Sequence, residues 1–231
     1  VYFYMDFDYA AKLAKENRNY PEAITYYEAA VKDLEEKFPT IEEDKKKEEN
    51  INKRGSYYYE ISNLYVRNKQ ADKGIEVFEK YLALLGDKAD ISDKYQLGTK
   101  YLAGWQQENN TPEQKKAYHD KAEQAFKDVL ATETENKLPK VLAYQMLARL
   151  NNPIDAVRDN YVNVINESED DAIKAKARNA RYEACRYLFF YYVAINTPNK
   201  AEATKYATIA KEIDPESDFV KAAFEHLKTM K

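Results

Sequence analysis

The sequence predicts an all-α protein built from consecutive antiparallel helix hairpins. Only 5 of its 231 residues are glycine and 7 are proline, whereas 33% are charged, which favours long helices with few tight turns. Apolar residues recur at spacings of three and four along almost the whole chain, and this period places them on one face of a helix. Small residues return at matching places in successive segments, which indicates a repeated unit.

The stretch from Gly55 to Gly86 shows this unit most clearly. Its first half carries Tyr58, Ile61, Ser62 and Tyr65 at helical spacing, and its second half carries Gly74, Phe78 and Tyr81. The polar residues 67–70 between the halves form a break short enough to fold the two helices back on each other. Gly74 is small at the point where we expect the two helices to approach most closely.

This stretch resembles a tetratricopeptide repeat (TPR) unit, in which an aromatic, Leu-Gly-like and tyrosine series on one helix meets a small-x-x-x-aromatic series on the next. The first segment repeats the register, because Phe7 precedes Ala23 by the same 16 residues that separate Tyr58 from Gly74. The resemblance implies a TPR-like right-handed α-solenoid of about five helix hairpins plus a C-terminal capping helix, or about eleven helices. We expect one repeat domain, 1–231, with units at about 4–38, 41–86, 91–132, 138–166 and 168–214 and a cap at 217–230.

Several helix starts follow from capping and proline signals. Pro21 falls in the first turn of a helix, where its missing N–H has no partner to lose. Residues 111–114 form a capping box with proline at the first helical position, so the second helix of the third unit should begin early. Residues 40–43 suggest another capping box, which would open a long charged helix. Asn152-Pro153 should start the second helix of the fourth unit.

The remaining units follow the same pairing of two apolar series. The third pairs Leu97, Gly98 and Tyr101 with Ala122, Phe126 and Val129; the fourth pairs Val141, Tyr144 and Ala148 with Val157, Tyr161 and Val164; the fifth pairs Tyr187, Phe190, Tyr191 and Ala194 with Ala203, Ala207 and Ala210. The first helix of the fifth unit is apolar nearly all round, which predicts burial on both sides. The last segment has apolar residues on one side, as the terminal helix of a repeat array requires.

Charge and hydropathy argue against two classes of partner. The formal net charge is −4, and the basic run at 45–47 is followed at once by two glutamates, so nucleic-acid binding is not expected. The longest apolar run, 187–195, is far shorter than the roughly 20 residues of a membrane-spanning helix. The chain begins at Val1 without a methionine and already in an apolar run, so we expect it to be a region of a longer protein. The oligomeric state stays open.

Residues suited to catalysis are sparse. His119 and His226 lie far apart in the sequence and belong to no metal-ligand spacing. Cys185 has no nearby histidine or glycine-rich turn and is expected to be a packed thiol. No nucleotide-binding or hydrolase motif is present. We therefore expect a protein that is not an enzyme and that binds no metal and no cofactor.

The TPR resemblance implies that the first helix of each pair lines a concave groove. The groove-facing positions would be Tyr59, Asn63, Arg67, Tyr95, Thr99 and Tyr192. Their aromatic, amide and cationic groups suit an extended peptide or a partner helix, which predicts a non-enzymatic scaffold for protein–protein interaction. The carboxylate clamp of chaperone-binding TPR proteins needs a fixed set of lysine, asparagine and arginine, and only Asn63 fits that set, so this branch is not expected.

The alternative interpretation is a helical receptor for a small molecule or a glycan in a bacterial surface or periplasmic system. The chain contains 21 tyrosines, and tyrosine rings can stack on sugar rings. Tyrosine-rich helical repeats of this kind also resemble exported TPR proteins of gut-type bacteria. That resemblance favours a periplasmic or exported location and leaves a cytoplasmic one open.

Overall fold

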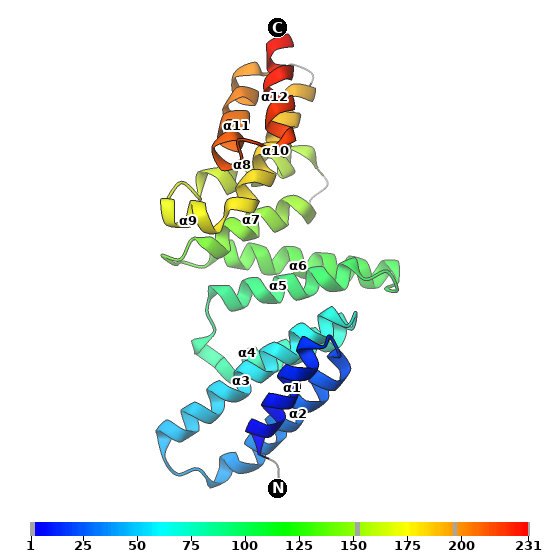
Figure 1. Ribbon diagram of the computed structural model, residues 1–231, viewed down its shortest axis with the longest axis vertical. Coiled ribbons are helices and arrows are strands. Elements are labelled where there is room, and N and C mark those ends of the chain that lie inside the picture. The colour runs from blue at the N-terminus through cyan, green and yellow to red at the C-terminus, as the bar shows by residue number, and fades with distance from the viewer. Residues whose placement is uncertain (1–2, 151–152, 196–197, 231) are drawn as a thin grey trace. The chain divides into compact units, whose positions relative to one another are not determined.

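The computed structural model describes residues 3–150, 153–195 and 198–230, which contain twelve α-helices, two short 3₁₀ helices and no β-strand (Figure 1). The predicted all-α class is confirmed. The α-helices are α1 (Tyr4–Glu16), α2 (Tyr20–Lys37), α3 (Asp44–Arg67), α4 (Ala71–Leu85), α5 (Ile91–Gln106), α6 (Pro112–Ala131), α7 (Leu138–Leu150), α8 (Ile154–Asn166), α9 (Asp171–Lys176), α10 (Arg178–Ala194), α11 (Lys200–Ile213) and α12 (Asp218–Thr229), and the 3₁₀ helices are η1 (Phe38–Thr40) and η2 (Gly86–Lys88). The chain forms two compact units, Val1–Ala125 and Phe126–Lys231.

Unit 1 contains two clear helix hairpins. Helices α1 and α2 pack as one pair and α3 and α4 as the next, while α2 lies against α3 and α4 lies against α5. Two tyrosines of α3 tie the pairs together, because Tyr58 donates a hydrogen bond to Glu35 of α2 at 2.6 Å and Tyr65 donates one to Glu28 at 2.8 Å. The predicted facing of these helices is confirmed, since Ile61, Ser62, Gly74 and Phe78 are all buried.

The turns inside the two hairpins share one backbone geometry. Arg18 between α1 and α2 has φ +58°, and Lys69 between α3 and α4 has φ +59°, a left-handed conformation that is uncommon outside glycine. The amides that follow bond in the same way: Asn19 donates to the carbonyl of Ala14 and Gln70 donates to that of Tyr65, both at 2.9 Å. These bonds satisfy carbonyls that the helix ends would otherwise leave unpaired.

Two of the predicted helix starts are confirmed and one is wrong. Pro21 lies in the first turn of α2, and Thr111 and Gln114 exchange hydrogen bonds at the start of α6 at 2.8 and 3.2 Å. The expected capping box at residues 40–43 does not form, because Thr40 belongs to η1 and its hydroxyl donates to the carbonyl of Lys37. Helix α3 begins instead at Asp44, after an N-cap at Glu43 that has no side-chain hydrogen bond.

Unit 2 contains the pairs α7 with α8 and α10 with α11, and α12 packs against α11. In α12, Val220, Ala223 and Leu227 are buried, so the terminal helix covers the last apolar face as predicted. Helix α8 begins at Ile154 after Pro153, and the predicted start residue Asn152 lies outside the described residues. The short α9 is an element that the repeat pattern did not predict. Its first turn is capped by Asp170, which accepts a hydrogen bond from the Ala172 amide at 2.9 Å.

The predicted facing of α10 is wrong. The sequence placed Phe190 and Ala194 on the packing face, but both are exposed, and the buried stripe runs through Arg181, Cys185 and Leu188 instead. The 16-residue register from Tyr187 to Ala203 fails here because α10 ends at Ala194 and α11 begins only at Lys200. Ala203 instead belongs to a core cluster with Phe189, against which Tyr192 and Val193 also pack. Helix α10 does pack against neighbours from both pairs, α8 and α11, as its uniform apolar sequence predicted, but the face that carries Phe190 is exposed.

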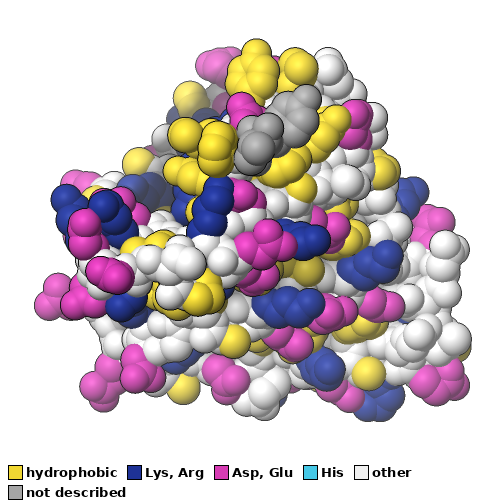
Figure 2. All heavy atoms as spheres, turned by 90° about the horizontal axis from the view of Figure 1, so that it is seen from below, with side chains coloured by type: hydrophobic (Ala, Val, Ile, Leu, Met, Phe, Trp, Pro, Cys, Tyr) yellow, Lys and Arg dark blue, Asp and Glu magenta, His cyan; other side chains and the backbone are white. Residues whose placement is uncertain are grey.

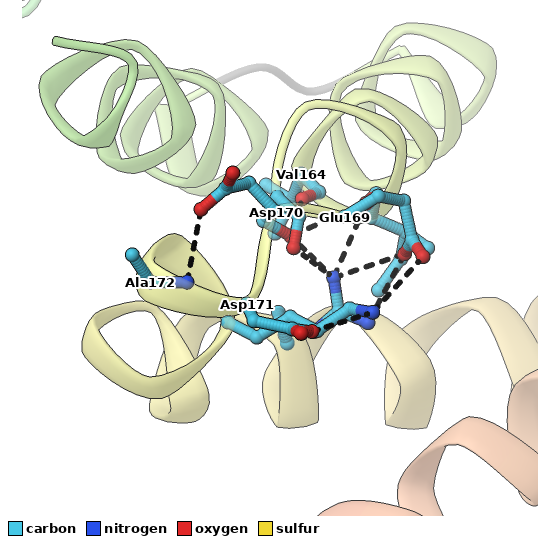
Figure 3. Close-up of polar contacts among 9 residues, drawn as sticks. Val164, Glu169, Asp170, Asp171 and Ala172 are labelled. Atoms are coloured by element: carbon cyan, nitrogen blue, oxygen red, sulfur yellow. Dashed lines mark hydrogen bonds and ion pairs between the residues drawn. The ribbon is translucent and has the colours of Figure 1, made fainter.

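The buried guanidinium of Arg181 donates hydrogen bonds to the C-terminal end of α8 and to the residues that follow it. Its Nη1 atom donates to the carbonyls of Ile165 and Ser168 at 3.3 and 2.7 Å and to the Ser168 hydroxyl at 2.6 Å. Both terminal nitrogens also reach the carboxylate of Glu169, at 3.1 and 3.2 Å (Figure 3). Only 5% of Arg181 is exposed, and these acceptors satisfy the group that burial would otherwise penalise.

Candidate peptide-binding surfaces

Three of the predicted groove residues follow one another along α3. Tyr59, Asn63 and Arg67 are four residues apart, so they occupy one side of the helix. The Tyr59 ring is half-buried and lies 5.9 Å from the Phe78 ring and 5.7 Å from the Tyr81 ring of α4. Tyr59 therefore helps to hold the α3–α4 hairpin together. Arg67 is exposed and forms no ion pair within the described part of the chain.

Lys100 of α5 reaches this side of α3 and is the central charged group of the surface. Only 4% of it is exposed, and its ammonium donates a hydrogen bond to Oδ1 of Asn63. The Nζ atom also lies 5.3 Å from the centre of the Phe78 ring and 5.8 Å from that of Tyr59. Burial lowers the pKa of Lys100 to about 8, and the positive charge of Arg67 acts in the same direction while Glu60 opposes it. Lys100 thus fixes the orientation of Asn63.

The two predicted groove residues of α5 are half-buried. Thr99 donates its hydroxyl hydrogen to the carbonyl of Gln96, one turn earlier in the same helix, at 2.7 Å. Tyr95 lies one turn before Thr99, so both occupy the same side of α5. The contacts around Lys100 bring Tyr59 and Asn63 together, with Arg67 near enough to affect the lysine's charge.

Tyr192 belongs to unit 2 and takes part in packing. Its ring is nearly parallel to that of Tyr206 on α11, with 5.8 Å between the centres, and nearly perpendicular to the ring of Tyr191, at 5.1 Å. Tyr206 is buried and Tyr192 is half-buried, so one face of the Tyr192 ring is used within the fold. The half-buried Tyr192 side chain still leaves part of its surface accessible.

The sequence did not predict the positions of four charged residues in the structure. Lysine and arginine are seldom buried, so the pattern gave no reason to place Lys100 or Arg181 inside. Glu183 and Arg186 of α10 were missed because the wrong facing of that helix left them unassigned. The first half of α10 does carry a signal for its facing, a stripe at spacings of three and four formed by Arg181, Ala184, Cys185 and Leu188.

Within residues 3–150, 153–195 and 198–230, no three histidine, cysteine or acidic side chains are grouped so that they could hold a metal ion. Cys185 is buried and unpaired, and burial raises the pKa of its thiol to about 12, although the nearby Arg181 lowers it. None of the described helices combines the length and apolar character needed to cross a membrane. On the face shown in Figure 2, acidic and basic side chains are interspersed over the lower part of the view, and hydrophobic side chains gather in its upper part.

The paired helices and their register define an all-α helical-repeat fold of the TPR type. No family model matches the chain, and no curated protein matches it. Among solved structures, the chain is similar to the C-terminal part of a TPR repeat-containing protein from Cytophaga hutchinsonii, with a TM-score of 0.62 and 20% sequence identity. The alignment covers 96% of this chain and 73% of that one. This likeness confirms the TPR-like fold that the sequence predicted.

Proposed function

We propose that this protein is a non-enzymatic scaffold for protein–protein interaction, and that the α3–α5 surface of unit 1 binds a peptide segment or a partner helix. We define the α3–α5 surface by Tyr59, Asn63, Arg67, Tyr95 and Thr99, with Lys100 beneath it. The supporting observation is the fixed position of Asn63, whose amide oxygen is held by Lys100. An oriented amide beside an aromatic ring and an exposed guanidinium can bond the backbone of a peptide and the charge of one of its side chains. We propose that the aromatic ring of Tyr192, in unit 2, also contacts a bound peptide.

The charges of the α3–α5 surface favour an acidic segment. Arg67 and Lys100 are both cationic near pH 7, and Arg67 has no carboxylate partner in the described part of the chain. A carboxylate from the bound peptide would supply one. Since a guanidinium can bond a carboxylate through two N–H groups, this contact would also fix the register of the peptide.

One observation favours the second candidate, a glycan or small-molecule receptor. A cavity of about 370 Å³ in unit 1 is lined by the amide side chains of Gln106, Gln107 and Asn109 together with Lys69. Amides can donate and accept the hydrogen bonds of sugar hydroxyls. However, the residues that line this cavity include no aromatic ring on which a sugar could stack, so we favour the peptide.

The proposal is tested by selecting peptides from a displayed random library on the immobilised protein and titrating the selected peptides in solution. We expect Arg67→Ala to weaken binding at least tenfold for acidic peptides, because it removes the exposed charge and leaves the packing intact. Tyr59→Ala should weaken it as well, provided that far-UV circular dichroism shows an unchanged fold. Selection of no peptide, or undiminished binding by both variants, would overturn the assignment of the surface.

The control removes an exposed tyrosine and an exposed cationic residue elsewhere in unit 1. Tyr9 and Lys12 are exposed on α1, and Lys12 is outside the α3–α5 surface. The double variant Tyr9→Ala, Lys12→Ala should bind the selected peptides as the wild type does. For the second candidate, a thermal-shift screen with oligosaccharides should give no change in Tm, and a clear shift that Gln106→Ala abolishes would favour the receptor instead.

A further inference from the structure

The outward face of α10 carries a cavity that the proposed function does not use. It has a volume of about 530 Å³, within the range of ligand-binding pockets. The lining residues recur at spacings of three and four, so they form one face of the helix, opposite the buried stripe through Arg181 and Leu188. They are Asn179, Tyr182, Glu183, Arg186, Tyr187 and Phe190.

The apolar part of this cavity is a fixed but exposed aromatic ring. Phe190 is 55% exposed, although its ring lies 5.5 Å from that of Phe189 and 5.8 Å from that of Phe219 on α12. These neighbours hold one side of the ring and leave the other open to water. A large apolar side chain placed on it would remove that surface from water without ordering Phe190 further.

The acidic group of the cavity is already satisfied. The carboxylate of Glu183 accepts hydrogen bonds from Gln145 at 2.7 Å, from Tyr161 at 2.7 Å and from two nitrogens of Arg149. These four donors use the acceptor sites of a carboxylate. Burial by itself would raise the pKa of Glu183, yet the bonds from Arg149, Tyr161 and Gln145 bring it below its ordinary value. Glu183 is thus an anion whose charge is neutralised inside the protein.

The cationic group of the cavity has no such partner. Arg186 is exposed, lies with its guanidinium 5.6 Å from the centre of the Phe219 ring, and forms no ion pair with any described residue. This cation–π contact uses the face of the guanidinium charge and leaves its N–H groups able to donate to a ligand. The one charge that the cavity offers to a ligand is therefore positive.

We propose that this face of α10 binds a partner peptide in which a carboxylate side chain lies two positions from a large apolar side chain. Arg186 and Phe190 are one helical turn apart, which separates them by roughly 5–6 Å. Side chains on one side of an extended peptide are about 6–7 Å apart at positions i and i+2. The carboxylate binds Arg186 while the apolar side chain packs on Phe190. The proposal is independent of the α3–α5 surface, because its residues all belong to unit 2.

The test is fluorescence anisotropy with four labelled hexapeptides that share flanking glycines. Their cores are Glu-Gly-Phe, Gln-Gly-Phe, Lys-Gly-Phe and Glu-Gly-Ala. We expect the first to bind at least tenfold more tightly than each of the others. Equal affinity for the glutamate and glutamine peptides, tighter binding of the lysine peptide, or no measurable binding of the first at millimolar concentration would overturn the proposal.

Variants assign the binding to this face. Arg186→Glu should abolish binding of the Glu-Gly-Phe peptide, and Phe190→Ala should weaken it at least fivefold; both residues are exposed, so both variants should fold. Lys221→Glu on α12 makes the same change of charge outside the cavity and should bind as the wild type does. Arg67→Ala should also leave this binding unchanged. If Arg67→Ala abolishes it while Arg186→Glu does not, the peptide binds the α3–α5 surface and the present proposal is wrong.

Discussion

Gly74 of α4 lies directly against the backbone of Ser62 in α3. A Cβ atom added to Gly74 would lie 2.9 Å from the Ser62 carbonyl oxygen and 2.8 Å from Cγ2 of Val66, while the Ser62 hydroxyl donates to the Gly74 carbonyl at 2.7 Å. The hairpin is therefore closed at the place where the sequence predicted the closest approach.

Gly74→Ala should destabilise the protein despite the better helix propensity of alanine. That propensity contributes about 1 kcal/mol in favour of the variant. Forcing a methyl group against a backbone carbonyl typically costs about 1–3 kcal/mol, so we expect a net loss of up to about 2 kcal/mol in the free energy of unfolding measured with urea. Gly55→Ala in α3 is the control, because its Cβ would meet no atom closer than 3.6 Å. It should stabilise the protein by about 0.5–1 kcal/mol, and a loss at Gly55 equal to that at Gly74 would contradict this account.

Phe78→Ala should lower the free energy of unfolding by about 3–5 kcal/mol, because the side chain is fully buried between Tyr59 and Tyr81. Phe190→Ala removes the same group from an exposed site and should cost less than half as much. Urea unfolding of both variants measures the difference. A loss below about 1 kcal/mol for Phe78→Ala would mean that α4 faces another way.

Lys100 should make stability rise between pH 8 and about 9.5. The folded pKa of about 8 lies below the ordinary lysine value, so over this range the unfolded chain binds more protons and unfolding becomes less favourable as the pH increases. The relative gain over Lys100→Met from pH 7 to 9.5 should be about 2 kcal/mol. The upper limit matters because buried tyrosines such as Tyr27, whose pKa is raised to about 12, reverse the trend above pH 10. If the free energies of unfolding of the wild type and of Lys100→Met changed in parallel with pH, Lys100 would be hydrated and not buried.

Arg181→Met should destabilise unit 2 by about 3 kcal/mol, since it leaves the carbonyls of Ile165 and Ser168 without their donor. Hydrogen exchange should show lost protection at the end of α8 and in α9 first. Glu169→Gln keeps an acceptor at an exposed position and should change stability by less than about 1 kcal/mol. Equal losses for the two variants would mean that the ion pair, and not the carbonyl contacts, matters.

Cys185 should resist thiol reagents in the native protein. It is fully buried, and the raised pKa of about 12 leaves almost no thiolate at pH 8. Labelling with a disulfide reagent should be slow in buffer and immediate in concentrated urea. Rapid labelling of the native protein would contradict the packing of α10 against α11.

The sequence predicted the parts of the fold that depend on local chemistry. Proline at Pro21 and the reciprocal bonds of Thr111 and Gln114 act within one turn, and the small residue Gly74 follows from the repeat register. The facing of α10 could not be obtained from the C-terminal half of the helix, because nearly every residue there is apolar and the helical period then has no contrast to detect. The roles of Lys100 and Arg181 depend on acceptors supplied by other helices, which no local pattern contains. The six predicted groove residues themselves stay a prediction.

Arg18 and Lys69, which carry the two left-handed turns, are 51 residues apart, the same step that separates Ala23 from Gly74. The two turns therefore occupy equivalent positions in successive hairpins, and the chain can be lengthened there by one repeat. A second copy of residues 19–69, inserted after Lys69, would add one α2, one α3 and one left-handed turn. Each hairpin of the longer chain would then still contain a left-handed turn, so the extended protein should fold with one additional helix pair.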